Sequence, residues 1–310
     1  AYSIELTQST TISASNTNYD GQDLIVNGAT LSIDGSHQFN SIQLINGAVL
    51  THSTTPSVKL KLTSRTFFID ASSSIDLTAK GDLPTPEVTD ASGGSYGGSG
   101  GIYESEGTTN PVFGDYKTPT DLGIGGIGSA GKTYGGGAIE IVTDQMTLNG
   151  NIIADGQGFN TFFSSQGGGS GGSILLNTGT IDGTGTIRAS GGSGYTFYGG
   201  GGGGGGRIAI YYQSTTFDLQ NNIINEGGVY KPLFGEAGQA GSIFLENTSP
   251  ANLAPVANAG LALMANELDE VVLYGSATDA DGNISSYAWT QLSGPAVSLS
   301  NADTATPAFI

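Results

Sequence analysis

Apolar residues recur in the middle of the chain with a period of about 35 residues. The segments "GGAIEIVTD", "GGSILLNTG" and "GGRIAIYYQ" begin alike, and "AGSIFLEN" repeats the pattern once more. The first isoleucines of the four segments are Ile139, Ile174, Ile208 and Ile243, at spacings of 35, 34 and 35 residues. Self-similarity at a fixed spacing marks a repeat architecture in which each repeat is one structural unit.

A second apolar column lies two residues further on, at Ile141, Leu176, Ile210 and Leu245. Apolar residues at positions i and i+2 share one face of a β-strand. More short apolar pieces follow in each repeat, separated by Asn-Gly, Asp-Gly or Thr-Gly turns. A sandwich or barrel of hairpins also has frequent turns, but it would not keep these columns in register. The pattern therefore predicts an all-β fold, a parallel β-helix (solenoid) that we expect to be right-handed.

Glycine-rich segments occupy the rest of each repeat, at residues 156–172, 191–206 and 227–241. A coil of three short strands needs only about 20 residues, so each repeat carries an excursion that leaves the same corner of its coil. We predict that these excursions stack as extended, polyproline-II-like segments, with hydrogen bonds between the excursions of successive coils. Mobile loops with glycine hinges are the alternative.

The repeats belong to a solenoid domain that we place at residues 1–250. Segments such as "DLIVNGATLSIDGS" predict shorter coils from about residue 20 onward, after a capping strand from Ser3 to Ser13. A large loop insertion covers residues 82–136. An unpatterned loop of this length is usually functional or disordered, and its aromatic residues argue against disorder.

The sequence pattern changes at residue 254, where the glycine-rich repeats give way to "PVANAG", "VVLYGS", "DADGNISSYAWTQLSGP" and "TATPAFI". This segment, 254–310, resembles PKD-type immunoglobulin-like domains of bacterial secreted and surface proteins, which also contain glycine-rich parallel β-helices like the one before it. The resemblance implies a partial Ig-like β-sandwich with Trp289 in its core. Family members have two more strands, so the domain is expected to be incomplete. Either the parent protein continues or another chain supplies the strands.

The same resemblance implies a calcium site. Asx residues of this domain bind Ca²⁺ in some relatives, and the matching positions here are Asn258, Asp279 and Asp281. Their oxygen atoms suit Ca²⁺, although "DADGN" is equally a turn sequence.

Composition narrows the classes of partner. The formal net charge is −18 and the isoelectric point about 4.1, a field that repels nucleic acid and anionic membranes. No apolar run approaches the roughly 18 residues of a membrane span. The chain lacks cysteine and begins with Ala1 rather than Met, as chains do after signal-peptide removal. We expect a secreted protein at the cell surface or outside the cell, with no nucleic-acid partner and no membrane insertion.

Candidate catalytic groups are few. Arg188 and Arg207 are expected to be outward residues, solvated or salt-bridged. His37 and His52 are expected at the surface and have neither triad order nor zinc-ligand spacing. We therefore predict a non-catalytic protein, with a polysaccharide lyase as the enzyme alternative.

Aromatic residues of the insertion and the glycine-rich loops are the candidate ligand-binding residues. They are Tyr96, Tyr103, Phe113, Tyr116, Phe162, Phe163, Tyr195, Phe197 and Tyr198. Gathered on one flank, they would hold a sugar chain or a neighbouring subunit, although a small core beneath the loops is an equal alternative. The predicted function is that of a structural or adhesive protein of a bacterial surface or matrix, which self-assembles into filaments through strand complementation. A carbohydrate-binding module is the main alternative.

Overall fold

The computed structural model describes residues 2–54, 59–103, 107–129, 131–158, 165–194, 199–229, 235–250 and 253–310. The chain divides into two compact units, Ala1–Ser249 and Pro250–Ile310. Throughout the described ranges the regular elements are β-strands, with no helix.

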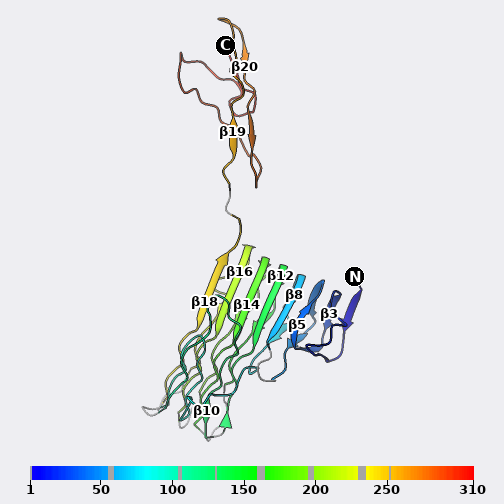
Figure 1. Ribbon diagram of the computed structural model, residues 1–310, viewed down its shortest axis with the longest axis vertical. Coiled ribbons are helices and arrows are strands. Elements are labelled where there is room, and N and C mark those ends of the chain that lie inside the picture. The colour runs from blue at the N-terminus through cyan, green and yellow to red at the C-terminus, as the bar shows by residue number, and fades with distance from the viewer. Residues whose placement is uncertain are drawn as a thin grey trace. The chain divides into compact units, whose positions relative to one another are not determined.

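The first unit is a parallel β-helix built on two long sheets (Figure 1). The nine-stranded sheet contains β1 (Ser3–Leu6), β3 (Asp23–Asn27), β5 (Gly35–Gln38), β6 (Ser41–Ile45), β8 (Leu60–Ile69), β12 (Ala138–Leu148), β14 (Ser173–Asp182), β16 (Arg207–Thr215) and β18 (Ser242–Asn247). The seven-stranded sheet contains β2 (Thr10–Ile12), β4 (Thr30–Ile33), β7 (Val49–Thr51), β9 (Ser74–Asp76), β13 (Asn151–Ile153), β15 (Thr186–Arg188) and β17 (Ile223–Ile224). The predicted fold class is confirmed.

The repeat columns stack in the register that their spacing predicts. Ile139 pairs with Ile174, which pairs with Ile208, which pairs with Ile243. Their side chains point into the solenoid and are buried in every coil except the last, where Ile243 is 46% exposed. That exposure arises because β18 has β16 as its strand partner and ends the sheet.

The solenoid begins earlier than the sequence suggests. β1 and β2 were expected to form one capping strand, but they belong to a complete coil of their own. Ile4 pairs with Leu24, and Ile12 pairs with Ile33, so both continue the inward columns. The chain turns between these two strands because only then do both apolar faces reach the core.

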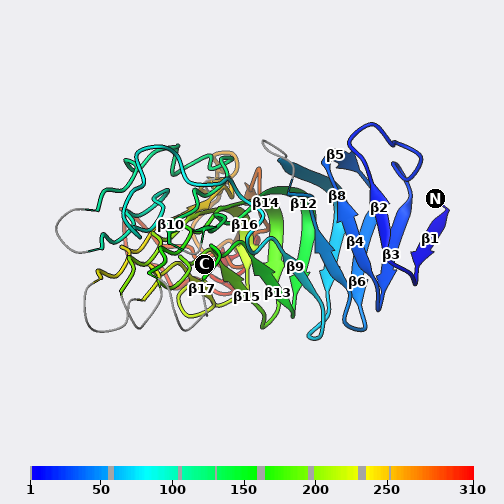
Figure 2. The ribbon, with the colours of Figure 1, turned by 90° about the horizontal axis from the view of Figure 1, so that it is seen from below.

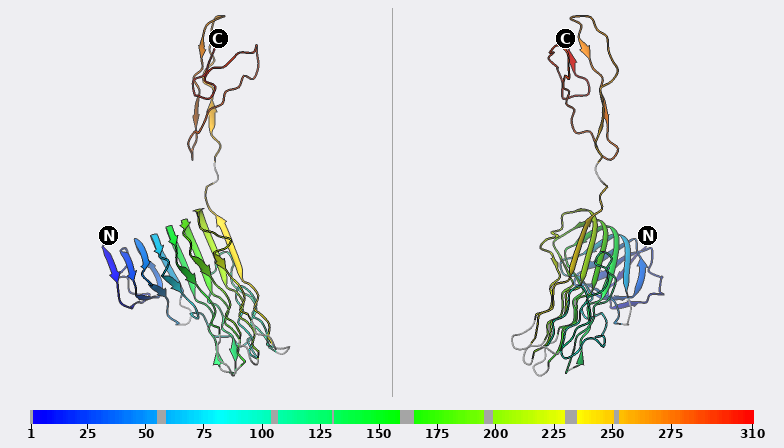
Figure 3. Two further views of the ribbon diagram at one scale, coloured as in Figure 1. Left: turned by 180° about the vertical axis from the view of Figure 1, so that it is seen from behind. Right: turned by 60° about the vertical axis from the view of Figure 1, so that its left-hand side comes forward.

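The glycine-rich excursions form a bundle of extended segments that continue downward from the strands (Figure 3). In the buried segment 200–206, the N–H groups of successive residues donate to three different neighbours in turn. Gly201 and Gly204 donate to Ala91 and Gly94. Gly202 and Gly205 donate to Glu236 and Gln239, and Gly203 and Gly206 donate to Gly192 and Ala189. Because the same neighbour returns after every third residue, the segment has the three residues per turn of a polyproline-II helix.

Carbonyl groups of the same segment accept hydrogen bonds from three further stretches of chain. Gly168 and Gly171 donate to Gly201 and Gly204, Gly101 and Gly98 donate to Gly202 and Gly205, and Gly228 donates to Gly203. Six stretches thus surround this segment. A Cβ atom at residue 203 would lie 2.0 Å from the carbonyl oxygen of Gly169, so a methyl group does not fit. The predicted stacking between levels is confirmed for the described residues.

The insertion at 82–136 supplies part of this bundle. Its residues 91–102 run beside segment 200–206, and the teal trace of the insertion lies along one side of the green and yellow segments (Figure 2). It also contains the short antiparallel pair β10 (Ile127–Gly128) and β11 (Gly131–Lys132). Residues 111–121 return over the outer face of the nine-stranded sheet, where Arg207 holds the carbonyl of Phe113.

The second unit contains two small antiparallel sheets. β19 (Val256–Asn258) pairs with β21 (Ser276–Thr278), and β20 (Val271–Val272) pairs with β22 (Ala308–Phe309). Trp289 lies against Gly275 and donates its indole N–H to the carbonyl of Thr304 at 2.9 Å. Among the described residues of this unit, only Pro307 and Ala308 are buried.

Candidate ligand-binding surfaces

Tyr96 is buried between the insertion and the nine-stranded sheet, and Phe113 beside it is half-buried. Tyr96 is fully buried, and its hydroxyl lies 2.7 Å from the Oγ of Ser173. Its ring centroid is 4.9 Å from that of Phe113 and 5.4 Å from the guanidinium carbon of Arg207. Tyr96 is therefore unavailable to a ligand, contrary to its assignment from sequence. The two rings form the small core that was the alternative interpretation, because they cover the outer face of β14 and β16.

Tyr116 belongs to a surface cluster. Its ring centroid and that of Tyr211 each lie 5.7 Å from the ring centroid of Phe244. The ammonium group of Lys117 lies 5.3 Å from the same Phe244 ring, and its carbonyl accepts the Tyr211 hydroxyl at 3.1 Å. Tyr116 remains 48% exposed. We call Tyr116, Lys117, Tyr211 and Phe244 the aromatic cluster.

Sequence reasoning identified Tyr116 but missed Tyr211 and Phe244. Both alternate with inward residues, Ile210 and Leu245, on strands whose register the repeat already fixes. The alternation along these strands already indicated that both side chains point outward, and this could have identified them from the sequence.

Tyr103 lines a separate hollow at the far end of the glycine bundle. The hollow has a volume of about 390 Å³. Its other lining residues are Asp90, Ala91, Ile127, Gly128, Ser129 and Ser165. Tyr103 is held there by an antiparallel bridge to Gly235. The remaining predicted ligand residues, Phe162, Phe163, Tyr195, Phe197 and Tyr198, lie outside the described residues.

The two arginines considered as lyase bases have structural partners. Arg188 forms an ion pair with Asp155, at 2.6 Å between Nη2 and Oδ2, in agreement with the expectation. Arg207 is 7% exposed and forms no salt bridge with the residues that the structure describes. Its guanidinium donates to the carbonyl of Phe113 at 2.7 Å and to the Oγ of Ser242 at 2.9 Å. The expectation of a solvated or salt-bridged residue is wrong for Arg207 because the insertion covers it.

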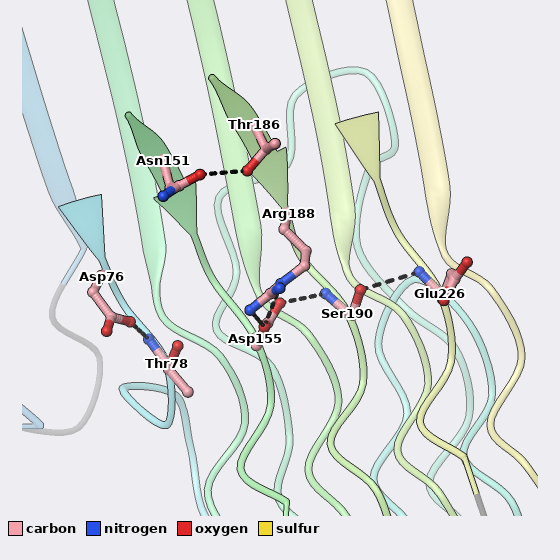
Figure 4. Close-up of polar contacts among 8 residues, drawn as sticks. All are labelled: Asp76, Thr78, Asn151, Asp155, Thr186, Arg188, Ser190 and Glu226. Atoms are coloured by element: carbon pink, nitrogen blue, oxygen red, sulfur yellow. Dashed lines mark hydrogen bonds and ion pairs between the residues drawn. The ribbon is translucent and has the colours of Figure 1, made fainter. Parts of the chain in front are cut away.

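A row of polar contacts runs along the outer face of the seven-stranded sheet (Figure 4). The Oγ1 of Thr186 donates to the Oδ1 of Asn151 at 2.6 Å, one coil away. Asp155 accepts the N–H of Ser190 at 2.8 Å in addition to the Arg188 ion pair. Because the polar side chains of one coil find their hydrogen-bond and ion-pair partners on the next coil, Asp155 and Arg188 act as cross-links between coils.

The two histidines are buried rather than exposed. The Nδ1 of His37 lies 3.0 Å from a carboxylate oxygen of Asp20, and its Nε2 lies 3.1 Å from the carbonyl of Asp34. The Nδ1 of His52 lies 2.6 Å from the carbonyl of Ser53, while its Nε2 accepts the N–H of Ala138 at 3.3 Å. The prediction of surface histidines is wrong, since each ring is partnered on both nitrogens inside the solenoid. Burial lowers the pKa of His52, which favours its neutral form.

The predicted calcium ligands accept backbone N–H groups in the second unit, two of them within local turns. Asn258 accepts the N–H of Gly260 at 2.8 Å, and Asp279 accepts the N–H of Gly282 at 3.0 Å. Asp281 accepts the N–H of Leu253 at 2.9 Å. Across the described ranges, no group of three or more His, Cys, Asp or Glu side chains is placed to hold a metal ion. Calcium binding at these residues stays a prediction.

An open groove of about 550 Å³ lies beside β19 and β21 in the same unit. Asn258, Asp279, Tyr287 and Trp289 are among the residues that line it.

The second unit also has a match among known families. Residues 259–310 match the family model described as K319L-like, PKD domain. This part of the chain is a PKD-type domain segment. PKD domains are typically extracellular. No curated protein and no solved structure matches the chain. Within the part of the chain that the structure describes, no helix is long and apolar enough to span a membrane.

Proposed function

We propose that this protein is a non-catalytic structural or adhesive element of a bacterial cell surface or extracellular matrix. The observation that carries the proposal is the glycine bundle fused to the solenoid. Its backbone segments are cross-linked in three directions by hydrogen bonds, whereas a sheet links its strands in one. Such a body is stiff without disulfides, and the chain contains no cysteine. The PKD-type segment supports an extracellular location, and the net charge of −18 supports solubility there.

Assembly of copies through strand complementation is part of this proposal. The groove beside β19 and β21 supports it, because an extended strand from a second copy would cover Trp289 and Tyr287 and extend the small sheet. Negative-stain electron microscopy of the 310-residue chain, with and without calcium, tests the idea. We expect regular filaments, and a field of isolated short rods would contradict assembly.

The enzyme alternative has its own assay. The protein is incubated with alginate and with pectin, and unsaturated products are followed by ultraviolet absorbance. We expect no product. Product formation that is lost in Arg188→Ala or Arg207→Ala would overturn the non-catalytic proposal.

Binding of an extracellular polysaccharide is a second candidate function, and the aromatic cluster favours it. Three aromatic rings meet at the surface there, with Tyr116 about half exposed. Such rings offer an apolar face to the C–H groups of a sugar together with hydroxyl groups at their rim. Electrophoresis through polysaccharide-containing gels should show retardation that Tyr116→Ala weakens. Tyr2→Ala is the matched control, because Tyr2 is an isolated aromatic that is 87% exposed.

A further inference from the structure

The hollow around Tyr103 has walls that are fixed by their backbones. Tyr103 donates its N–H to the Oγ of Ser92 at 3.4 Å, and its carbonyl accepts the N–H of Gly107 at 3.3 Å. Two further lining residues are joined directly, since the N–H of Ser129 donates to the carbonyl of Ser165 at 3.0 Å. The carbonyl of Ala91 accepts the N–H of Gly201 at 2.9 Å, which anchors another part of the lining to the glycine bundle. The hollow is therefore preformed by main-chain contacts.

The chain enters this hollow through two strained residues. Asp90 and Ala91 have φ values of 48° and 56°, in the left-handed region that residues other than glycine rarely adopt. Residues held in this region are strained, and such residues cluster at binding sites. Asp90 is exposed, and its carboxylate forms no hydrogen bond or ion pair within the described residues. The strained backbone thus presents an unpartnered acceptor at the rim.

The lining has a definite chemical character. Among the described residues that line it are one aromatic ring, one carboxylate, two serines and the apolar side chain of Ile127, and none of them is Lys, Arg or His. Hydroxyl groups donate to a carboxylate and to serine oxygens, and the C–H face of a sugar ring packs on an aromatic face. The Asp90 carboxylate would repel an anionic sugar, and none of the described lining residues carries a positive charge to offset that repulsion.

We propose that this hollow binds one residue of a neutral sugar chain. Tyr103 supplies the stacking face, Asp90 accepts sugar hydroxyl groups, and Ser129 completes the rim. The volume of about 390 Å³ is near the lower end of small-molecule pockets, roughly 300–1,000 Å³, and so suits a single sugar residue. This proposal rests on the glycan-binding function proposed above, and it names a site distinct from the aromatic cluster and a class of glycan.

The test uses the full 310-residue chain and two sets of probes. The neutral set contains oligosaccharides of glucan, mannan, galactan and xylan, and the anionic set contains oligosaccharides of alginate, polygalacturonate and sulfated galactan. Binding is screened on an array and measured by titration calorimetry. We expect binding to at least one neutral probe and none to the anionic set. Tyr103→Ala should weaken the affinity at least tenfold, and Tyr103→Phe, which keeps the ring, less than threefold.

Asp90 provides a paired test of the carboxylate. Asp90→Asn keeps the shape and the left-handed preference, and Asp90→Gly removes the carboxylate while relieving the backbone. Both should weaken binding about fivefold, with melting temperatures no lower than that of the parent chain. Tyr2→Ala serves as the control for loss of an exposed aromatic.

Three results would overturn the proposal. Binding of anionic probes alone would contradict the neutral class. Unchanged affinity in Tyr103→Ala, with loss in Tyr116→Ala, would leave glycan binding intact and move it to the aromatic cluster. No binding to any probe would remove both the site and the glycan function, while the structural proposal would still be judged by microscopy.

Discussion

The strands of the solenoid and the segments of the glycine bundle belong to the same coils but are held together differently. In the strands, coils are joined by parallel ladders and by inward side chains such as Ile174 and Leu176, which are fully buried. In segment 200–206, no side chain separates the backbones, and six neighbouring stretches surround one segment. The strands therefore derive their stability mainly from apolar burial, and the bundle from close backbone packing and hydrogen bonds.

This difference decides what each region tolerates and what it connects. A hydrophobic core accepts changes of similar volume, whereas the bundle interior, as at residue 203, leaves no space for a methyl group. A sheet joins each coil to the next, while the bundle also joins segments distant in sequence, such as 91–102 and 200–206. The glycine bundle thus fixes the insertion, including the walls of the Tyr103 hollow.

The largest effect is expected in the interior of the bundle. In Gly203→Ala, the new Cβ would lie 2.0 Å from the carbonyl oxygen of Gly169 and 2.4 Å from its carbon, and neither backbone has room to retreat. We expect a loss of more than about 3 kcal/mol in the free energy of unfolding, beyond the usual range for overpacking. Thermal unfolding measures it.

Gly158→Ala is the matched control for this change. The nearest atom to its added Cβ would be the nitrogen of Ser193 at 3.2 Å, and residue 158 is exposed. We expect a change within about 1 kcal/mol. Equal destabilisation by the two variants would contradict the close packing described for the bundle interior.

In the strands, the corresponding change removes a core side chain. Leu176→Ala leaves a cavity in the second apolar column, where the side chain is fully buried. Buried leucine-to-alanine changes cost about 2–5 kcal/mol, and we expect about 3 kcal/mol by urea denaturation. The conservative Leu176→Met should cost less than about 1.5 kcal/mol. A methionine variant as unstable as the alanine variant would show that shape, rather than burial, governs this column.

Arg207 connects the strands to residues 111–121 of the insertion, and its loss should act on the insertion. Arg207→Gln removes the guanidinium that donates to the carbonyl of Phe113 at 2.7 Å and 3.0 Å. We expect a loss of about 2 kcal/mol, as for hydrogen bonds from a charged group. Hydrogen exchange should rise first in residues 107–121. Faster exchange spread evenly over the strands would argue against this local role.

The register of the strand columns was predictable because the spacing of a repeat is enough to show which residues pair. Four isoleucines at intervals of 34 or 35 residues determine the register without any knowledge of the turns. The stacking of glycines followed from the same logic, since excursions from one corner must lie side by side. The first coil was less visible because β1 and β2 are short and carry no glycine excursion.

The contacts of the candidate sites were not predictable in the same way. Tyr96 contacts Ser173 and Arg207, which lie 77 and 111 residues further along the chain on the next strands of the sheet, and no local pattern encodes such a pairing. His37 and His52 were expected at the surface because no triad order or zinc-ligand spacing gave them a role, but each ring is buried and has partners on both nitrogens. The Tyr103 hollow depends on backbone conformation at Asp90 and Ala91, which composition does not report.

Acid should weaken the turns of the solenoid through Asp70. Burial raises the pKa of this carboxyl, but hydrogen bonds from the N–H of Asn46 and from Ser73 and Ser72 outweigh it and lower the pKa from 3.8 to about 2. Because the folded-state pKa is depressed, the stabilisation is complete above pH 3.8 and is lost as the pH falls toward 2. With allowance for solvent screening, we expect about 1 kcal/mol.

Melting temperatures measured between pH 5 and pH 2 test this assignment. Asp70→Asn should melt lower than the parent chain at pH 5 and should converge with it near pH 2. A constant difference across that range would assign the effect to the hydrogen bonds alone and not to the charge.

The smallest effect is expected on the outer face of the seven-stranded sheet. Arg188→Gln removes the ion pair with Asp155, in which the Arg188 side chain is 43% exposed and the Asp155 side chain 15% exposed. Asp155 still accepts the hydrogen bond from the N–H of Ser190. Exposed pairs contribute about 0.2–1 kcal/mol and weaken with salt. We expect a loss under about 1 kcal/mol that shrinks further in 1 M NaCl. A larger, salt-insensitive loss would show that this face, like the glycine bundle, depends on close packing, because the stem of Arg188 would then be the part that matters.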